Sequence, residues 1–533
     1  MVGIRWSHVL GAFAAGAALL TAIAASSSAE TPPTPSGAAG IFSGGMIAPG
    51  GVSLVAFTGT AAQLNLAGAA VKAVSISATA GGRMLTFVVG APDFVNADFN
   101  AAYPTGLNAT PVIVKAVDVT SPIPPLHTVP AGWPTTLQLG SRDQAGGAAA
   151  MKATAPFAFR YVYLSGGVNT DQNWTTWNSG GTYVTRFIAD SVANSIIPVF
   201  SFYQIRQSAP GNRMEEKAGV AANLEDAGTM AAYFDNLKFF FDLARAFPSS
   251  TVVLHVEPDM WGFIQQRSAS DNGASVRVKV ASSGVTDVAA FPDNAAGLAR
   301  AIVKLRDQYA PNVILGYHMS TFGSPFDPYD NRNTDLTTDA AATRVANFYT
   351  SLGARFDITF AEFLDRDAAF YQEVRGDATK WNDVADFARR ARYIRKFSSI
   401  SQLRVILWQI PVGNTKMRAM DNTSGHYQDN IVEWFLDDPG RTHLQTYADA
   451  GVVAFLFHSC FSNVVLAQEG KEFGKKATCS FDAMNDGITN PNPINGNTLV
   501  SLNTDDDGGY FKQQVATYYA AGPMALNPFT PVP

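Results

Sequence analysis

Two carboxylates follow one apolar run in the middle of the chain. The strand predicted over 252–257 ends in Glu257, and Pro258 and Asp259 come next. Because Pro258 cannot donate to a strand ladder, the strand should stop there, and an extended backbone would bring Glu257 and Asp259 to the same side. Burial favours the protonated form of a Glu, which a general acid needs near neutral pH. We predict that Glu257 is a general acid and that Asp259 adjusts its pKa; the alternative is a salt bridge to an arginine.

A second carboxylate ends another apolar run. The strand predicted over 358–362 ends in Glu362, and Asp365 and Asp367 follow on either side of Arg366. Hydrolysis of a glycosidic bond needs two carboxyl groups across the scissile bond, about 5 to 5.5 Å apart for retention and about 6.5 to 9.5 Å for inversion. We predict Glu362 as nucleophile or general base because it ends the apolar run, and Asp365 as a substrate contact or part of a helix start.

Aromatic and hydrogen-bonding side chains occur at the ends of the other predicted strands. Sugars present flat apolar faces with rims of hydroxyl groups, so their sites combine aromatic rings with a few oriented polar groups. Ordinary packing is the alternative for each aromatic residue. Besides Asp365, the predicted substrate contacts at strand ends and in loops are Tyr203, Gln204, Trp261, Tyr317, His318, Trp408, Gln409, His426, Tyr427 and His458.

Histidines near the same strand ends suggest a second chemistry. His255, His318 and Asp259 could bind a divalent metal in a hydrolase or deacetylase, since His and carboxylate are common zinc ligands. The sequence has no H-E-x-x-H or H-x-H pair, so we expect no metal and no other cofactor. It also has no G-x-S-x-G elbow and no GxxxxGK[ST] phosphate loop, two motifs that would have indicated other reactions.

The first residues have the pattern of an export signal. Arg5 precedes an apolar, Ala-rich run over 9–25 that ends in small residues and is followed by Pro, Ser and Gly. This pattern predicts a signal peptide over 1–29 rather than a membrane span. In an exported chain, the two cysteines Cys460 and Cys479 are expected to form a disulfide. We expect a secreted or periplasmic protein that does not contact the membrane after cleavage.

Composition limits the classes of partner. The 533 residues include 44 acidic and 38 basic side chains, for a net charge of -6. Lys and Arg do not form a block of the kind that binds nucleic acid. We therefore expect a polysaccharide or oligosaccharide substrate, no nucleic acid, and a monomer.

The elements that must position these residues fall into two regions. After a linker over 30–40, the segment 41–139 has short Val-, Ala- and Thr-rich runs and frequent turn residues, which predict a small β-sandwich-like domain. A Gly- and Ala-rich linker is expected over 140–155. From 156 to 533, apolar strands alternate with amphipathic helices, as in a barrel of β/α units around a parallel sheet. The small domain could bind carbohydrate or act as a spacer.

Seven strand-helix units can be placed in the second region. An eight-stranded barrel needs one further strand, whereas a seven-stranded barrel or an open sheet needs none. The predicted strands are 159–164, 196–203, 252–257, 313–318, 358–362, 405–410 and 452–458. The predicted helices between them include 230–247, 294–309, 339–352, 383–397 and 430–448.

Over about residues 157 to 522 the chain resembles secreted barrel-type glycoside hydrolases. The resemblance rests on Glu257 in Leu-His-Val-Glu-Pro-Asp, on Glu362, and on the strand end Leu407-Trp408-Gln409. The Glu-Pro-Asp turn is also similar to one in a cellobiohydrolase family with a seven-stranded barrel, whose other motifs are missing here. The resemblance implies an extracellular glycosidase that cleaves a polysaccharide with two carboxylates. The alternatives are a metal-dependent hydrolase or deacetylase, and a non-catalytic carbohydrate-binding surface protein.

Overall fold

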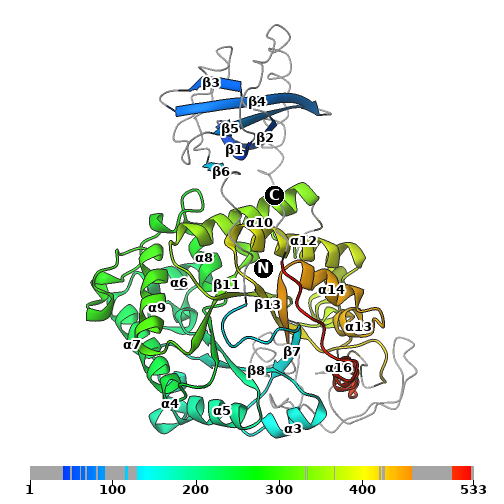
Figure 1. Ribbon diagram of the computed structural model, residues 1–533. Coiled ribbons are helices and arrows are strands. Elements are labelled where there is room, and N and C mark those ends of the chain that lie inside the picture. The colour runs from blue at the N-terminus through cyan, green and yellow to red at the C-terminus, as the bar shows by residue number, and fades with distance from the viewer. Residues whose placement is uncertain are drawn as a thin grey trace. The chain divides into compact units, whose positions relative to one another are not determined.

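The computed structural model divides the chain into two units, Met1–Pro125 and Leu126–Pro533 (Figure 1). In the first unit it describes the backbone of six strands. In the second it describes residues 129–529 apart from 330–331, 333, 365, 419, 421, 423–426 and 459–506.

The six strands of the first unit pair antiparallel in two sheets. One sheet has the order β2 (Gly51–Gly59), β1 (Gly40–Ala48), β6 (Lys115–Val117). The other has the order β3 (Ala62–Leu66), β4 (Ala69–Thr79), β5 (Gly82–Val89). The region is rich in strands, as its Val and Thr content indicates, while a sandwich-like packing stays a prediction.

The second unit is a closed barrel of eight parallel strands with helices between them (Figure 1). Neighbouring strands follow chain order, and the last pairs with the first. The expected β/α barrel is therefore confirmed, with eight strands. These are β7 (Gln138–Arg142), β8 (Phe159–Ser165), β9 (Ile197–Tyr203), β10 (Val252–Val256), β11 (Val313–Met319), β12 (Ile358–Glu362), β13 (Val405–Pro411) and β14 (Val452–His458).

The strand that sequence patterns did not reveal is β7, which pairs with β14 and β8 and closes the barrel. It crosses the expected boundary at residue 139, and the helix α3 (Ala148–Thr154) occupies part of the expected linker 140–155. The structure thus corrects both assignments. The strand was missed because its sequence, Gln-Leu-Gly-Ser-Arg, has no β-branched residue. Close packing requires the glycine, since a Cβ on Gly140 would lie 2.5 Å from the Leu456 side chain and 2.6 Å from the Phe159 carbonyl oxygen.

The helices follow the strands in the β/α order that the sequence predicts. They are α4 (Trp174–Trp177), α5 (Thr182–Ala193), α6 (Glu216–Leu224), α7 (Ala227–Arg245), α8 (Met260–Arg267), α9 (Ala295–Tyr309), α10 (Asp335–Ser351), α11 (Ala368–Phe370), α12 (Val384–Ser401), α13 (Ile431–Leu436), α14 (Thr442–Asp449) and α16 (Tyr510–Ala520). The single helix expected over 430–448 is two helices, because the chain turns at Pro439 and Gly440 and Arg441 has a left-handed φ of 55°.

Alternate strand residues face two different core layers, as strand geometry requires. One layer fills the barrel interior and includes Tyr161, Val199, Val253, Ile314, Phe360, Ile406, Trp408 and Leu456. The other lies between strands and helices and includes Val162, Phe200, Leu254, Leu315, Leu407 and Phe455. A residue that continues the inward-facing alternation at the carboxyl end of a strand therefore lies at the open end of the barrel interior.

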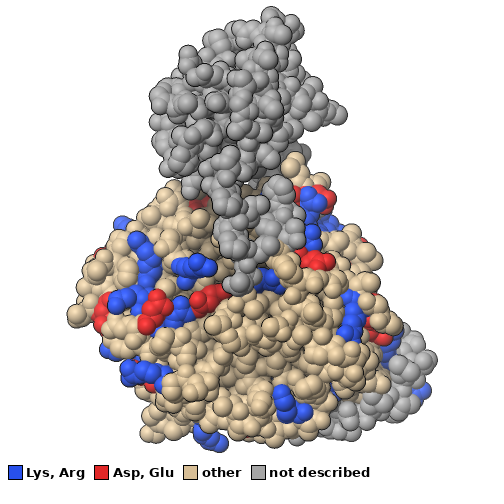
Figure 2. Space-filling view, in the orientation of Figure 1, with Lys and Arg blue, Asp and Glu red and all other residues tan. Residues whose placement is uncertain are grey.

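Two surface properties concern the expected partners. Within the described part of the chain, no helix has both the length and the apolar character needed to cross a membrane. On the face shown in Figure 2, basic side chains of the barrel unit are interspersed with acidic ones.

Candidate active site

A cavity of about 640 Å³ lies where the barrel strands end. This end of a parallel barrel carries the functional loops in enzymes with this fold. Its lining combines acidic, basic and aromatic side chains. Among them are Glu216, Asp259, Asp327, Glu362, Arg366, Lys380, Tyr163, Tyr203, Phe263, Phe322, Tyr329, Tyr371, Trp408 and Gln409.

Asp259 reaches this cavity from the turn after β10. It stands at the N-cap of α8, yet its side chain makes no capping hydrogen bond to that helix. Instead, Tyr203 at the end of β9 donates a hydrogen bond to the Asp259 carboxylate. Burial raises the pKa of the Tyr203 phenol well above its usual value, and the charge of Asp259 raises it further. Tyr203 is therefore a hydrogen-bond donor that orients Asp259.

Glu257 does not line the cavity that Asp259 reaches. Its φ of 52° lies in the left-handed region, so the backbone does not stay extended as the sequence analysis assumes. The Glu257 side chain is fully buried, and it accepts hydrogen bonds from the backbone N–H groups of Gln204 at 3.1 Å and Ile205 at 3.3 Å. Burial raises the pKa of Glu257 well above its usual value.

Glu257 lies buried within electrostatic range of Tyr203 and Asp259 and also of the layer between strands and helices. Its charge helps to raise the pKa of Tyr233, a residue of α7 in the layer between strands and helices, although burial is the main cause. Glu257 is absent from the cavity lining, whereas its neighbours Pro258 and Asp259 are part of it. The expectation that both carboxylates project together is therefore corrected: of the two, Asp259 lines the cavity and Glu257 is buried beside it.

Glu362 is the last residue of β12 and lines the cavity half-buried. Ile358 and Phe360, which precede it at alternate positions, lie in the barrel interior, so strand alternation directs Glu362 into the cavity. Burial raises the pKa of Tyr163 well above its usual value, and the charges of both Glu362 and Asp259 contribute to this shift. The Tyr163 hydroxyl therefore lies within electrostatic range of both carboxylates.

Two consecutive residues of β13, Trp408 and Gln409, line the cavity. A regular strand would direct them to opposite faces. The register between β13 and β14 shifts between Leu407 and Ile410, and Gln409 has a φ of 58°, so a local bulge brings both side chains to the same opening. The Gln409 side chain accepts a hydrogen bond from the Tyr163 hydroxyl at 2.6 Å.

Trp408 separates the cavity from the polar residues of the barrel interior. Its ring lies 5.7 Å from that of Tyr163 and, edge to face, 4.8 Å from that of His255. The side chain is only 2% exposed. Within the described structure, its indole N–H has no hydrogen-bond partner, and neither has the hydroxyl of Tyr329, another lining residue. Both groups are buried without a partner among the described residues, which is uncommon for polar groups in a folded protein.

The histidines below Trp408 bond within the barrel interior. His255 Nε2 lies 2.9 Å from His318 Nδ1, and the other His255 ring nitrogen lies 3.2 Å from the Ser201 hydroxyl. Burial lowers the pKa of His255 well below its usual value and that of His318 to about 3. His458 Nδ1 lies 2.8 Å from the Tyr161 hydroxyl. In the part of the chain described, no three His, Cys, Asp or Glu side chains converge as metal ligands.

Of the predicted substrate contacts, Tyr203, Trp408 and Gln409 line the cavity, and several others do not. Tyr317 points outward from β11 and packs against Trp261, whose indole N–H donates to the Val256 carbonyl. Gln204 is buried and donates to the Leu164 carbonyl. Tyr427 packs on Phe370 in a separate small cluster. His318 and His458 lie in the barrel interior.

Four residues with predicted roles lie outside the described residues. They are the contacts Asp365 and His426 and the cysteines Cys460 and Cys479. Their roles and the disulfide stay predictions.

Sequence reasoning missed several lining residues. Tyr163 could have been found, because it alternates with Tyr161 on the first predicted strand and so faces the same side. Asp327, Tyr329 and Arg366 lie in loops and Lys380 ends a three-residue 3-10 helix, where no periodic pattern shows which way a side chain points.

No protein-family model matches the chain, and no curated protein matches it. Similar solved structures include a modular endo-beta-1,4-mannanase of glycoside hydrolase family 26 from Cellulomonas fimi, with 12% identity, 74% of this chain and 76% of that chain covered, and a TM-score of 0.38. A GH26 endo-beta-1,4-mannanase from Bacillus sp. JAMB-750 has 13% identity, 61% and 77% coverage, and a TM-score of 0.34. A GH5 xyloglucan-specific beta-1,4-glucanase from a ruminal metagenomic library has 11% identity, 72% and 89% coverage, and a TM-score of 0.36.

Proposed function

We propose that this protein is an extracellular glycoside hydrolase that cleaves a polysaccharide with Asp259 and Glu362. The observation that carries the proposal is that these two carboxylates, from the ends of β10 and β12, line one cavity together with the rings of Tyr163, Tyr203 and Trp408. Pockets of about 300 to 1,000 Å³ commonly hold small molecules. Aromatic rings with a few oriented polar groups suit the apolar faces and hydroxyl rims of sugars.

The reaction requires different roles for the two carboxyl groups. One protonates the oxygen of the leaving group, while the other attacks the anomeric carbon or activates a water molecule. We assign the role of nucleophile or general base to Asp259, because the hydrogen bond that Tyr203 donates favours its charged form. Glu362 then acts as the general acid. Glu257, which the sequence analysis placed in the acid role, instead supports the turn at Gln204 and Ile205.

The proposal is tested by measuring reducing-sugar release from plant, fungal and bacterial polysaccharides, beginning with beta-1,4-mannan and xyloglucan. The samples are the wild type, the wild type with EDTA, and a variant that carries both Asp259→Asn and Glu362→Gln. We expect release that persists in EDTA and is lost in the double variant. No release from any polymer, or equal release by the double variant, would refute the proposal, and loss in EDTA would favour a metal-dependent hydrolase.

A further inference from the structure

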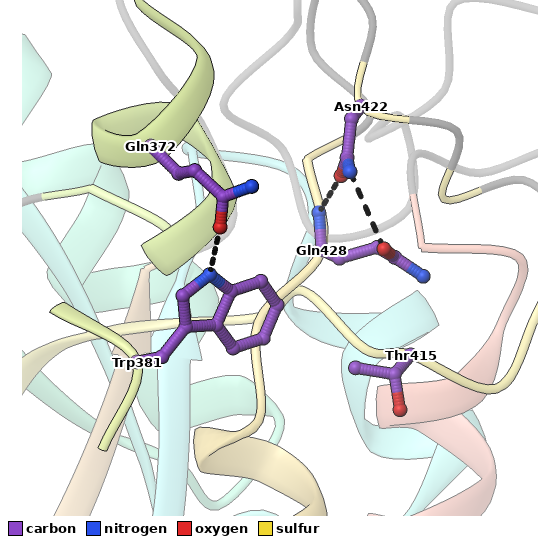
Figure 3. Close-up of a pocket in the computed structure, with 5 residues that line it drawn as sticks. All are labelled: Gln372, Trp381, Thr415, Asn422 and Gln428. Atoms are coloured by element: carbon purple, nitrogen blue, oxygen red, sulfur yellow. Dashed lines mark hydrogen bonds between the residues drawn. The ribbon is translucent and has the colours of Figure 1, made fainter. Parts of the chain in front are cut away.

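A second, smaller cavity of about 280 Å³ is lined by Gln372, Trp381, Thr415, Asn422 and Gln428 (Figure 3). These residues come from two loop regions, one after β12 and one after β13. The cavity therefore belongs to the same end of the barrel as the carboxylates. None of the side chains used in the assignment above lines it.

The chemistry of this cavity is neutral and polar around one aromatic ring. Its lining, as far as the structure describes it, consists of three amides, one hydroxyl and one indole, with no charged side chain. A phosphate or a carboxylate would find no opposite charge there, whereas sugar hydroxyl groups pair with amides and sugar faces stack on an indole. The lining therefore favours an uncharged sugar residue over an ionic ligand.

Hydrogen bonds already hold these side chains in place, as Figure 3 shows. The Trp381 indole N–H donates to the Gln372 side-chain oxygen at 2.7 Å. The Gln428 backbone N–H donates to the Asn422 side chain at 3.0 Å, and the Asn422 amide donates to the Gln428 side chain at 3.3 Å. Gln428 is only 3% exposed. Such prior ordering lowers the entropic cost of binding.

The segment 371–381 contributes residues to the lining of both cavities. Tyr371 and Lys380 line the larger cavity, and the residues that follow each of them, Gln372 and Trp381, line the smaller one. The Lys380 ammonium lies 5.4 Å from the centre of the Tyr371 ring. A cation–π contact on one side and the Trp381 hydrogen bond on the other thus fasten the two ends of this segment together.

The geometry points to the smaller cavity as a second saccharide subsite. It holds an uncharged sugar residue of the same chain whose scissile bond lies at Asp259 and Glu362, and the chain passes along the segment 371–381. This inference rests on the proposed function, and it specifies an oligosaccharide or polymer as substrate rather than a disaccharide.

Calorimetric binding to the Glu362→Gln variant, which blocks turnover, tests the subsite. The probes are beta-1,4-mannohexaose and cellohexaose, with mannobiose and cellobiose as short counterparts. We expect Trp381→Ala, added to this variant, to weaken hexasaccharide binding about tenfold and to leave disaccharide binding unchanged. Trp381→Phe keeps a ring and should weaken it less. Trp177→Ala is the matched control, because Trp177 is 39% exposed and lines neither cavity.

Three results would overturn the subsite: no binding of either hexasaccharide, equal weakening of hexasaccharide and disaccharide, or no effect of Trp381→Ala. Thermal unfolding of each variant identifies a loss that is due to misfolding. The test also separates the two proposals. Binding that depends on Trp381 without sugar release by the wild type would refute the hydrolase alone, whereas sugar release without dependence on Trp381 would refute the subsite alone.

Discussion

At the scale of single residues, the backbone at Glu257 decides which carboxylate can meet a substrate. Val253 lies in the barrel interior and Leu254 in the outer layer, so a regular strand would carry Glu257 inward. Its left-handed φ of 52° turns the chain instead, and such a conformation is unfavourable for a residue with a Cβ. The two backbone hydrogen bonds that Glu257 accepts help to offset this cost.

The hydrogen bond from Tyr203 to Asp259 gives a test at this scale. Tyr203→Phe removes the donor that orients Asp259, and a hydrogen bond to a charged group contributes about 1.5–3 kcal/mol. We expect kcat/KM to fall about tenfold or more on the polymer that the wild type cleaves. The matched control is Tyr233→Phe, because the buried Tyr233 hydroxyl has no partner in the described structure. Equal losses in the two variants would contradict an orienting role for Tyr203.

At the scale of elements, the apolar strands could be predicted and the loops could not. The strands β8 to β14 contain apolar runs whose buried positions leave a clear pattern, and Glu362 could be found because it ends such a run. The strand β7 has no such pattern. The position of Asp259 depends on the left-handed turn at Glu257, and that of Gln409 on the bulge in β13. The position of Tyr317 depends on the phase of strand alternation. Single-sequence patterns specify none of these three features.

The role of β7 in closing the barrel can be tested at Gly140. A Cβ there would lie 2.5 Å from the Leu456 side chain, so Gly140→Ala should lower the free energy of unfolding by about 1–3 kcal/mol. Gly228→Ala is the control. Gly228 lies in the first turn of α7, where alanine favours helix, and the atom nearest to its added Cβ would be an Asp226 carboxylate oxygen at 3.4 Å. Urea unfolding measures both variants. A Gly140→Ala protein as stable as the wild type would contradict the close packing.

At the scale of the whole molecule, buried carboxyl groups should control how stability depends on pH. Burial raises the pKa values of Glu257 and Asp367 well above their usual range and that of Asp429 to about 7. The folded protein therefore keeps protons that the unfolded chain loses above about pH 4. Such groups lower the free energy of unfolding as pH rises towards their folded pKa values.

The buried histidines act in the opposite direction, but only at lower pH. His255 and His318 stay neutral in the folded protein, so they favour folding as pH rises to about 6.5, the usual pKa of His. Above pH 6.5 the carboxyl groups dominate. We expect the free energy of unfolding to fall between pH 6.5 and 8, by up to about 1.4 kcal/mol per pH unit for each retained proton.

Urea unfolding at several pH values from 6.5 to 8 measures this slope. Glu257→Gln cannot ionise, so its slope should be smaller than that of the wild type. Stability that rises with pH in this window, or the same slope in both proteins, would contradict the assignment of retained protons to these buried groups.

The most direct test of the catalytic pair compares kcat for Asp259→Asn, Glu362→Gln and Glu257→Gln on the polymer that the wild type cleaves, with urea unfolding to verify each fold. We expect the first two variants to lose about 10²–10⁴-fold in kcat, the usual contribution of general acid–base catalysis, and folded Glu257→Gln to stay within about threefold of the wild type. If folded Glu257→Gln were as inactive as Glu362→Gln while Asp259→Asn stayed active, the assignment of Asp259 would be wrong and Glu257 and Glu362 would be the catalytic pair.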